Sequence, residues 1–286
     1  MDAPPQNEDC RPFVTIAGYL ESMGLNSPRI VGADFDQGFV LMTDLGSTQY
    51  LQALEQDPDR ADDLYADAIA ALLMLQTNGE AYQQKLPGYD DAFVAFELSI
   101  FRDWLCSRHL GVEFSAADER RWQDCCTTLI DSAMCQQRVF MHRDYHSRNL
   151  MVTREHNPGI LDFQDAVEGP LSYDVVSLFK DCYIKWPDDK INRWALEYYD
   201  RLGAPFKDDL CADRFLRDFD LMGVQRHLKA AGIFARLYHR DGKPAYLDDI
   251  PRTLSYLSDT TCQYPELGFL SELIGQRIIP AMQKID

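Results

Sequence analysis

Hydrophobic positions recur with helical spacing along most of the chain. Phe13, Ile16 and Leu20 are spaced at three and four residues, which predicts a helix over residues 8–23 that ends before Gly24. The same spacing predicts further helices at residues 58–76, 92–110, 116–137, 172–183, 189–202, 212–239, 247–260 and 266–283. The pattern therefore indicates a mainly helical protein.

Short β-forming runs interrupt the helical pattern near the start of the chain. Two of them, at residues 29–31 and 39–43, follow the first predicted helix. Asp44-Leu45-Gly46 then breaks the pattern, and the remaining chain is mostly helical. Ser115 and Asp118 resemble a capping box, with aspartate in place of the usual glutamate, and mark the start of one later helix. The pattern predicts an α+β protein with a small β-containing segment ahead of a helical one.

A polar loop between two apolar runs carries the residues most typical of catalysis. Asp144 and Asn149 follow the strand-like run Arg138–Met141, and Asp162 ends the next apolar run. The turn signal His156-Asn157-Pro158-Gly159 predicts a hairpin that brings Asp162 beside Asn149. Asn149 and Asp162 would then ligate Mg²⁺ on the phosphates of a nucleotide, because this hard cation prefers oxygen ligands. Asp144 would orient the attacking hydroxyl group, so the spacing predicts phosphoryl transfer.

These residues match a known motif with one departure. His142-Arg143-Asp144 and Asn149 match the catalytic loop H-R-D-x-x-x-x-N of protein kinases, and Asp162-Phe163-Gln164 stands where those enzymes have D-F-G. A glycine at that third position belongs to a mobile activation segment. Its replacement by Gln164 makes the chain resemble small-molecule kinases of the aminoglycoside phosphotransferase and choline kinase superfamily. A chance match is the alternative, and the four polar residues in register between two apolar runs disfavour it.

Composition adds limits to this interpretation. The chain has 286 residues, of which 46% are hydrophobic, enough for one large or two modest domains. Eight cysteines without a C-x-x-C pair, and a start unlike a signal peptide, predict reduced thiols in the cytoplasm. No apolar run approaches the ~18 residues of a membrane span.

Charge narrows the choice of partners. Lys and Arg number 28 and Asp and Glu number 46, so the net charge is 28 − 46 = −18. This charge disfavours nucleic acid or an anionic membrane as a partner, and nothing in the sequence indicates an obligate protein partner. It would suit a polycationic substrate such as an aminoglycoside, although a solvated acidic surface is the commoner reason for such a balance.

Longer phrases narrow the resemblance further. The segments concerned are residues 1–5, 8–13, 142–151, 161–166, 173–174, 178–181 and 220–229. They resemble the bacterial cell-wall amino-sugar kinases, which phosphorylate the anomeric hydroxyl of N-acetylmuramate and N-acetylglucosamine in peptidoglycan recycling. The first and last are specific to this subfamily, whereas the catalytic loop is shared by the whole superfamily.

The resemblance implies a protein-kinase-like fold of two lobes. A small, incomplete β-containing N-lobe would span residues 1–44, and a mainly helical C-lobe would span residues 45–286. It also implies an enzyme that uses ATP and Mg²⁺, with Asp144 as catalytic base, Asn149 and Asp162 as Mg²⁺ ligands, and the backbone of Thr43, Asp44 and Leu45 against the adenine. Family members carry further residues ahead of Met1-Asp2-Ala3-Pro4-Pro5, including a loop over the phosphates, so the chain is expected to be an N-terminally truncated form whose activity the sequence does not settle.

Five other residues are weaker candidates. His142 is expected to pack and fix the loop rather than act as a base, and Asp174 is expected to bond the backbone of the loop from behind. Asp165 either bonds a hydroxyl of the sugar substrate or is a solvated loop charge. Arg148 and Arg226 are candidates for the lactyl carboxylate of the sugar, and an ordinary ion pair is the alternative for each.

Two other functions remain open at this point. An aminoglycoside kinase would suit the acidic charge, but those enzymes usually have His-Gly-Asp where this chain has His142-Arg143-Asp144. A truncated, non-catalytic binding module of the pseudokinase type is opposed by the retention of every catalytic-loop and metal residue.

Overall fold

The computed structural model describes residues 1–6 and 8–284, which form two compact units. The first unit consists of Met1–Gly88, Gln137–Asp181 and Pro187–Ala212, and the second consists of Tyr89–Gln136, Cys182–Trp186 and the chain from Asp213 onward. The lobe boundary that the sequence predicts after residue 44 lies within the first unit and stays a prediction. Each unit is described by itself below.

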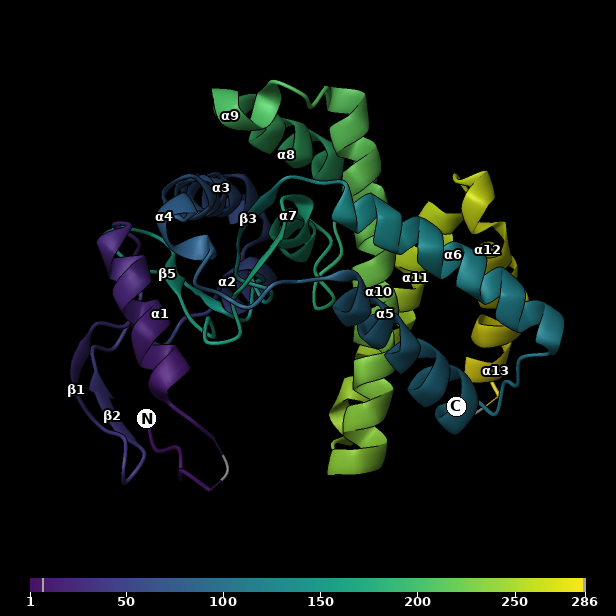
Figure 1. Ribbon diagram of the computed structural model, residues 1–286, viewed down its shortest axis with the longest axis horizontal. Helices are drawn as coiled ribbons and strands as arrows, with labels where there is room; N and C mark the ends of the chain where they lie inside the picture. Colours follow the sequence, from purple (N-terminus) through teal and green to yellow (C-terminus); the bar gives the residue numbers. More distant parts are fainter. Residues whose placement is uncertain (7, 285–286) are drawn as a thin grey trace. The chain divides into compact units, whose positions relative to one another are not determined.

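The first unit begins with helix α1 (Arg11–Ser22), which lies beside a hairpin of strands β1 (Ile30–Asp34) and β2 (Phe39–Met42) in Figure 1. Pro12 stands in the first turn of α1, where its missing N–H has no partner to lose. The helix therefore starts three residues later than its hydrophobic pattern predicts. Both predicted strands are confirmed, although β1 begins one residue later and ends three residues later than predicted.

The helices of the first unit pack around buried aromatic rings. Tyr65, Phe179 and Trp194 come from three helices, and the ring of Tyr65 lies 4.5 Å from that of Trp194 and 5.9 Å from that of Phe179, centroid to centroid. All three side chains are buried, so they form the centre of this core. The helices are α2 (Tyr50–Gln56), α3 (Ala61–Asn78), α4 (Glu80–Gln83), α7 (Ser172–Phe179), α8 (Asp188–Arg201) and α9 (Ala204–Lys207), with a 3₁₀ turn at Pro58–Arg60.

Two small antiparallel sheets hold the candidate catalytic residues. Strand β3 (Arg138–Met141) pairs with β6 (Val167–Pro170), and β4 (Leu150–Met151) pairs with β5 (Gly159–Ile160). The predicted hairpin is confirmed as β4–β5. Strand β6 was not predicted, because its partner β3 is about thirty residues away along the chain. The catalytic loop connects β3 to β4, and Asp162 follows β5.

The second unit is helical. Helix α6 begins with the predicted capping box, in which Ser115 Oγ accepts a hydrogen bond from Asp118 N and Asp118 Oδ2 accepts one from Ser115 N. Gly232 of α10 allows close packing, since a Cβ there would lie 2.6 Å from the backbone of Ile100 and Phe101. The helices are α5 (Asp91–Ile100), α6 (Ala116–Met134), α10 (Ala212–Asp241), α11 (Ile250–Thr261), α12 (Gly268–Leu273) and α13 (Ile279–Met282), with π-helical segments at Phe101–His109 and Ile274–Ile278 and 3₁₀ turns at Pro244–Asp249 and Pro265–Leu267.

Some predicted helix bounds are wrong. The helix predicted over residues 172–183 ends at Phe179, because Lys180 leaves the helical conformation with φ −107° and ψ 50°. The helix predicted over residues 266–283 is divided into 3₁₀, α and π segments. Within the described part of the chain, no helix combines the length and the hydrophobicity that a bilayer crossing requires.

Candidate active site

The loop between β3 and β4 folds back on itself around Asn149. Asn149 Nδ2 donates to the carbonyl oxygen of Asp144 at 3.0 Å and to Oδ2 of Asp162 at 3.1 Å. Leu161 N donates to the carbonyl oxygen of Asn149 at 2.9 Å, which ties the segment after β5 to the end of the loop. The structure thus brings Asp144, Asn149 and Asp162 together, as the hairpin predicts, while their chemical roles stay predictions.

Asp174 of α7 holds the start of this loop. Its Oδ2 accepts a hydrogen bond from His142 N at 2.7 Å, and its Oδ1 accepts one from Arg143 N at 3.0 Å. Arg143 has φ +77°, a left-handed conformation that costs a non-glycine residue free energy unless neighbouring contacts enforce it. The buried carboxylate supplies those contacts. Asp174 therefore bonds the loop backbone from behind.

His142 is completely buried, and burial lowers the pKa of its imidazole to about 4. The ring is therefore neutral at neutral pH. Its Nδ1 lies 3.2 Å from Asp144 N and accepts the hydrogen bond of that backbone amide. A buried acceptor that fixes the backbone of Asp144 fits the expected structural role better than that of a general base.

Two further residues hold the loop against the helices. The hydroxyl of Tyr145 donates to the carbonyl oxygen of Ala68 in α3 at 2.9 Å. Ser147 bonds Asp181, which follows α7, and its carbonyl oxygen accepts a hydrogen bond from Leu51 N in α2 at 3.0 Å. Sequence reasoning missed Asp181; the available signal was a carboxylate seven residues after Asp174, directly behind an apolar helix.

Asp162 is held in an uncommon backbone conformation. Its φ is +60°, and its Oδ1 accepts a hydrogen bond from Gln164 Nε2 at 2.8 Å. The residue between them, Phe163, is buried and stacks on Phe13 of α1, with ring centroids 4.7 Å apart. Gln164, the departure from the D-F-G pattern, therefore orients the carboxylate of Asp162.

The side-chain oxygen atoms of Asn149 and Asp162 fit Mg²⁺. The side chain of Asn149 uses Nδ2 in the two hydrogen bonds described above, so its Oδ1 is directed away from them and is the atom that can meet a cation. Asp162 adds a carboxylate that is exposed to solvent. An amide oxygen and a carboxylate beside each other suit a hard divalent cation that keeps part of its water shell.

A cavity of about 460 Å³ lies at the break after β2. Its lining includes Thr43, Asp44 and Leu45, the three residues predicted to meet an adenine. The β4–β5 hairpin forms part of its surroundings, because His156 also lines the cavity and a Cβ on Gly159 would lie 2.9 Å from Leu45 Cδ1. The same hairpin leads to Asn149 and Asp162, so one element connects the cavity to the candidate metal ligands.

Hydrogen bonds also join the β4–β5 hairpin to the segment after α1. Ile160 N donates to the carbonyl oxygen of Asn26 at 2.7 Å, and Asn26 Nδ2 donates to the carbonyl oxygen of His156 at 3.0 Å. Asn26 lines the same cavity. These hydrogen bonds attach the segment after α1 to the turn and to β5.

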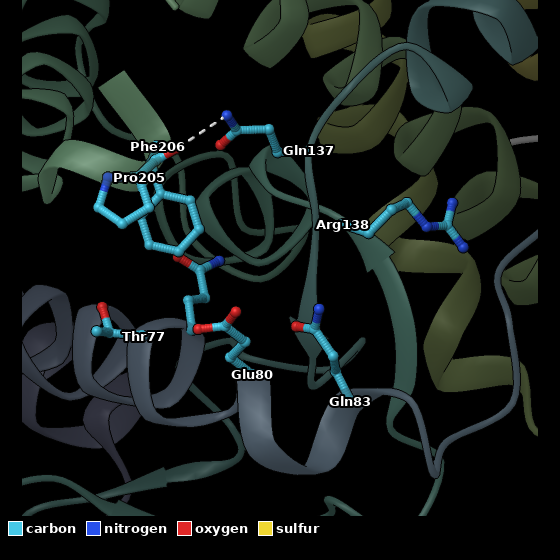
Figure 2. Close-up of a pocket in the computed structure, with 8 residues that line it drawn as sticks. Thr77, Glu80, Gln83, Gln137, Arg138, Pro205 and Phe206 are labelled. Carbon is cyan, nitrogen blue, oxygen red and sulfur yellow. Dashed lines mark hydrogen bonds between the residues drawn. The ribbon is translucent and has the colours of Figure 1, made fainter. Parts of the chain in front are cut away.

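A second cavity of the first unit, about 260 Å³, is lined by none of the predicted site residues. Figure 2 shows Glu80 and Gln83 rising from α4 toward Phe206, while the side chain of Arg138 points away from this group. Gln137 Nε2 donates to the carbonyl oxygen of Pro205 at 3.1 Å and closes one side.

Comparison with known proteins decides the family. A model described as the phosphotransferase enzyme family matches residues 1–214. The chain belongs to the phosphotransferase enzyme family. A protein of Pseudomonas aeruginosa named N-acetylmuramate/N-acetylglucosamine kinase is 48% identical over 278 residues, which cover 96% of this chain and 80% of that protein. A protein of the same name from Neisseria meningitidis serogroup B is 40% identical, over 96% of this chain and 83% of its own length.

Solved structures confirm the kinase-like fold of this phosphotransferase. The structure of an aminoglycoside phosphotransferase with ADP bound aligns with a TM-score of 0.56 at 13% identity, covering 87% of this chain and 81% of that one. At this identity the likeness concerns the fold alone. Together with the short strands and the many helices, it confirms the predicted α+β, protein-kinase-like fold.

The three residues predicted to bind substrate lie in both units of the phosphotransferase. Asp165 is exposed after β5, and its carbonyl oxygen accepts a hydrogen bond from Arg143 Nη1 at 3.3 Å. Arg148 is half-buried in the catalytic loop. Arg226 is buried in α10 of the second unit, where its Nη1 lies 3.6 Å from Cys182 Sγ. Their contacts with a substrate stay predictions.

Proposed function

We propose that this phosphotransferase transfers the γ-phosphoryl group of ATP to the anomeric hydroxyl of N-acetylmuramate and N-acetylglucosamine. The observation that supports this substrate most directly is the 48% identity, over nearly the whole chain, to a relative that is named for these two sugars. Such a reaction would serve the recycling of peptidoglycan in the cytoplasm.

Asp144 is the proposed catalytic base. Its carboxylate would accept a hydrogen bond from the anomeric hydroxyl and take the proton as the oxygen attacks the γ-phosphorus. The backbone of Asp144 is held on one side by His142 Nδ1 and on the other by Asn149 Nδ2. This rigidity matters because holding the nucleophile in line supplies much of the rate enhancement in phosphoryl transfer.

Asn149 and Asp162 are the proposed Mg²⁺ ligands, through Asn149 Oδ1 and the Asp162 carboxylate. Mg²⁺ held there would neutralise charge on the β- and γ-phosphates. The contribution of the chain is to keep these two side chains beside each other, which the hydrogen bond of 3.1 Å between them does. Gln164 keeps the carboxylate turned toward Asn149 by holding its other oxygen.

The cavity at Thr43, Asp44 and Leu45 is the proposed place of the adenine. A base seated there would have the β4–β5 hairpin next to it, and the phosphates would extend along that hairpin toward Asp162. Asp165 is proposed to bind a hydroxyl of the sugar, and Arg148 is proposed to bind the lactyl carboxylate of N-acetylmuramate.

The test of this function is a comparison of acceptors. The purified chain is incubated with Mg²⁺ and ATP, and products are identified by mass spectrometry and ³¹P NMR. We expect sugar 1-phosphates from N-acetylmuramate and N-acetylglucosamine, and no product from the methyl glycoside of N-acetylglucosamine, whose anomeric oxygen is blocked. Phosphate on that glycoside, or faster turnover of kanamycin, would overturn the substrate. Tight ATP binding without turnover of any acceptor would support the non-catalytic alternative instead.

A further inference from the structure

The catalytic loop has an anchor between its two proposed functional residues. Ser147 lies three residues after Asp144 and two residues before Asn149. Its backbone N donates to Oδ2 of Asp181 at 3.0 Å, and its hydroxyl donates to the same oxygen at 2.5 Å. Both side chains are completely buried. One carboxylate oxygen therefore receives two hydrogen bonds from a single loop residue.

A buried carboxylate requires a physical reason. Removing a carboxylate from water is costly unless hydrogen-bond donors replace the lost hydration, and charge-assisted bonds of this kind are about twice as strong as neutral ones. The backbone also changes course to supply this group. Helix α7 ends at Phe179 although its apolar pattern continues to Tyr183, and Asp181 then reaches Ser147. The early end of α7 thus places the carboxylate of Asp181 against the loop.

The two aspartates at the ends of α7 hold different parts of the loop. Asp174 bonds the backbone of His142 and Arg143, and Asp181 bonds Ser147. The segment that carries Asp144 is therefore fixed on both sides.

The separation of Asp144 and Asn149 follows from these two anchors. Asn149 Nδ2 lies 3.0 Å from the carbonyl oxygen of Asp144, and this contact requires the segment between them to keep one conformation. Ser147 is in the middle of that segment. A shift at Ser147 would move Asn149 relative to Asp144 while leaving the contacts of Asp174 in place.

We infer that Asp181 is a positioning residue for phosphoryl transfer: through Ser147 it sets the separation of the proton acceptor Asp144 from the metal-ligand amide of Asn149. This inference rests on the proposed roles of those two residues.

The test uses Asp181→Asn and Ser147→Ala, with Asp218→Asn as matched control. Asp218 is also a buried carboxylate, but it lies in α10 of the second unit and bonds Arg214. We expect Asp181→Asn to lower kcat about a hundredfold, the scale of a reacting group misplaced by about 1 Å. The KM for sugar should change less than threefold, and the Mg²⁺ concentration for half-maximal rate should rise about tenfold. Ser147→Ala keeps the backbone bond and should lose about tenfold in kcat.

Hydrogen exchange of the backbone amides at residues 144–149 separates this inference from the proposed function. Exchange there should rise in Asp181→Asn and not in Asp218→Asn, even if no sugar is phosphorylated by the unmodified chain. If Asp181→Asn does not fold, Ser147→Ala decides. Unchanged exchange in these amides, or a kcat and Mg²⁺ dependence within twofold of the unmodified chain, would overturn the positioning role.

Discussion

Gly159 offers the sharpest test of how the nucleotide cavity is joined to the catalytic loop. It lies in β5, and a Cβ at this position would lie 2.9 Å from Leu45 Cδ1, 3.2 Å from Thr153 Cγ2 and 3.3 Å from Met151 Cβ. The nearest of these atoms is the end of a flexible side chain that also lines the cavity. Gly159→Ala should therefore turn Leu45 rather than break the hairpin.

The expected magnitude follows from these three contacts. Overpacking of a filled core costs ~1–3 kcal/mol, and the low end applies because Leu45 can move and the backbone of alanine loses less entropy than that of glycine. We expect the free energy of unfolding to fall by about 1 kcal/mol. We expect the affinity for ATP to fall about tenfold, because the displaced Leu45 side chain would enter the space proposed for the adenine.

The assay pairs Gly159→Ala with Gly32→Ala. Gly32 also lies in a strand of the first unit, but a Cβ there meets nothing within 4 Å. The control should keep its affinity for ATP and be as stable as the unmodified chain or slightly more stable. Calorimetric titration with ATP and urea unfolding give the two quantities. If both variants bind ATP alike, Leu45 does not face the nucleotide, and the proposed place of the adenine is wrong.

Three further predictions concern the loop itself. Asp144→Asn should lower kcat by several orders of magnitude without unfolding the chain, and sugar turnover within tenfold of the unmodified enzyme would refute its role as base. Asn149→Ala and Asp162→Ala should both raise the Mg²⁺ concentration for half-maximal rate, Asp162→Ala more strongly because it removes a charge; an unchanged Mg²⁺ titration in Asp162→Ala would contradict the metal role. Without Mg²⁺, the free energy of unfolding should fall by about 3 kcal/mol as the pH is lowered from 6.5 to 4. The reason is that the pKa of buried His142 is about 4, so in this range the imidazole takes up a proton in the unfolded chain but not in the folded chain. Urea unfolding across this pH range measures the loss. His142→Asn keeps an acceptor near the position of Nδ1 and should reduce the loss. An equal loss in both proteins would refute His142 as its cause.

Local patterns predicted the elements that local interactions determine. The strand Arg138–Met141 has the predicted bounds, and the helix after Ser115 starts at its capping box. The β4–β5 hairpin follows from a turn signal between two nearby apolar runs, and it placed Asp162 beside Asn149. Each of these depends on residues close together in the sequence.

Elements that depend on distant partners were not predictable in this way. Strand β6 is only four residues long and exists as a partner of β3. Helix α2 has seven residues, too few for a periodic pattern, and its Leu51 N bonds the carbonyl oxygen of Ser147 about a hundred residues away. The contact of Asp181 with Ser147 spans 34 residues. Pairings at such separations leave no periodic signal, so only the folded structure reveals them.

The catalytic loop shows why a rigid arrangement of charges suits this chemistry. Asp174 and Asp181 are buried, and the amides of the loop bond them. In the proposed reaction, Asp144 and Asn149 would therefore need little reorganisation as charge shifts during phosphoryl transfer. A preorganised polar site lowers the barrier by avoiding that reorganisation. Arg143 and Asp162 have left-handed backbone conformations, which cost free energy and are maintained by contacts with surrounding residues. Because these contacts come from α7 and from Gln164, a small-molecule kinase of this type can keep its catalytic groups in place without the mobile activation segment that a glycine after Phe163 would permit.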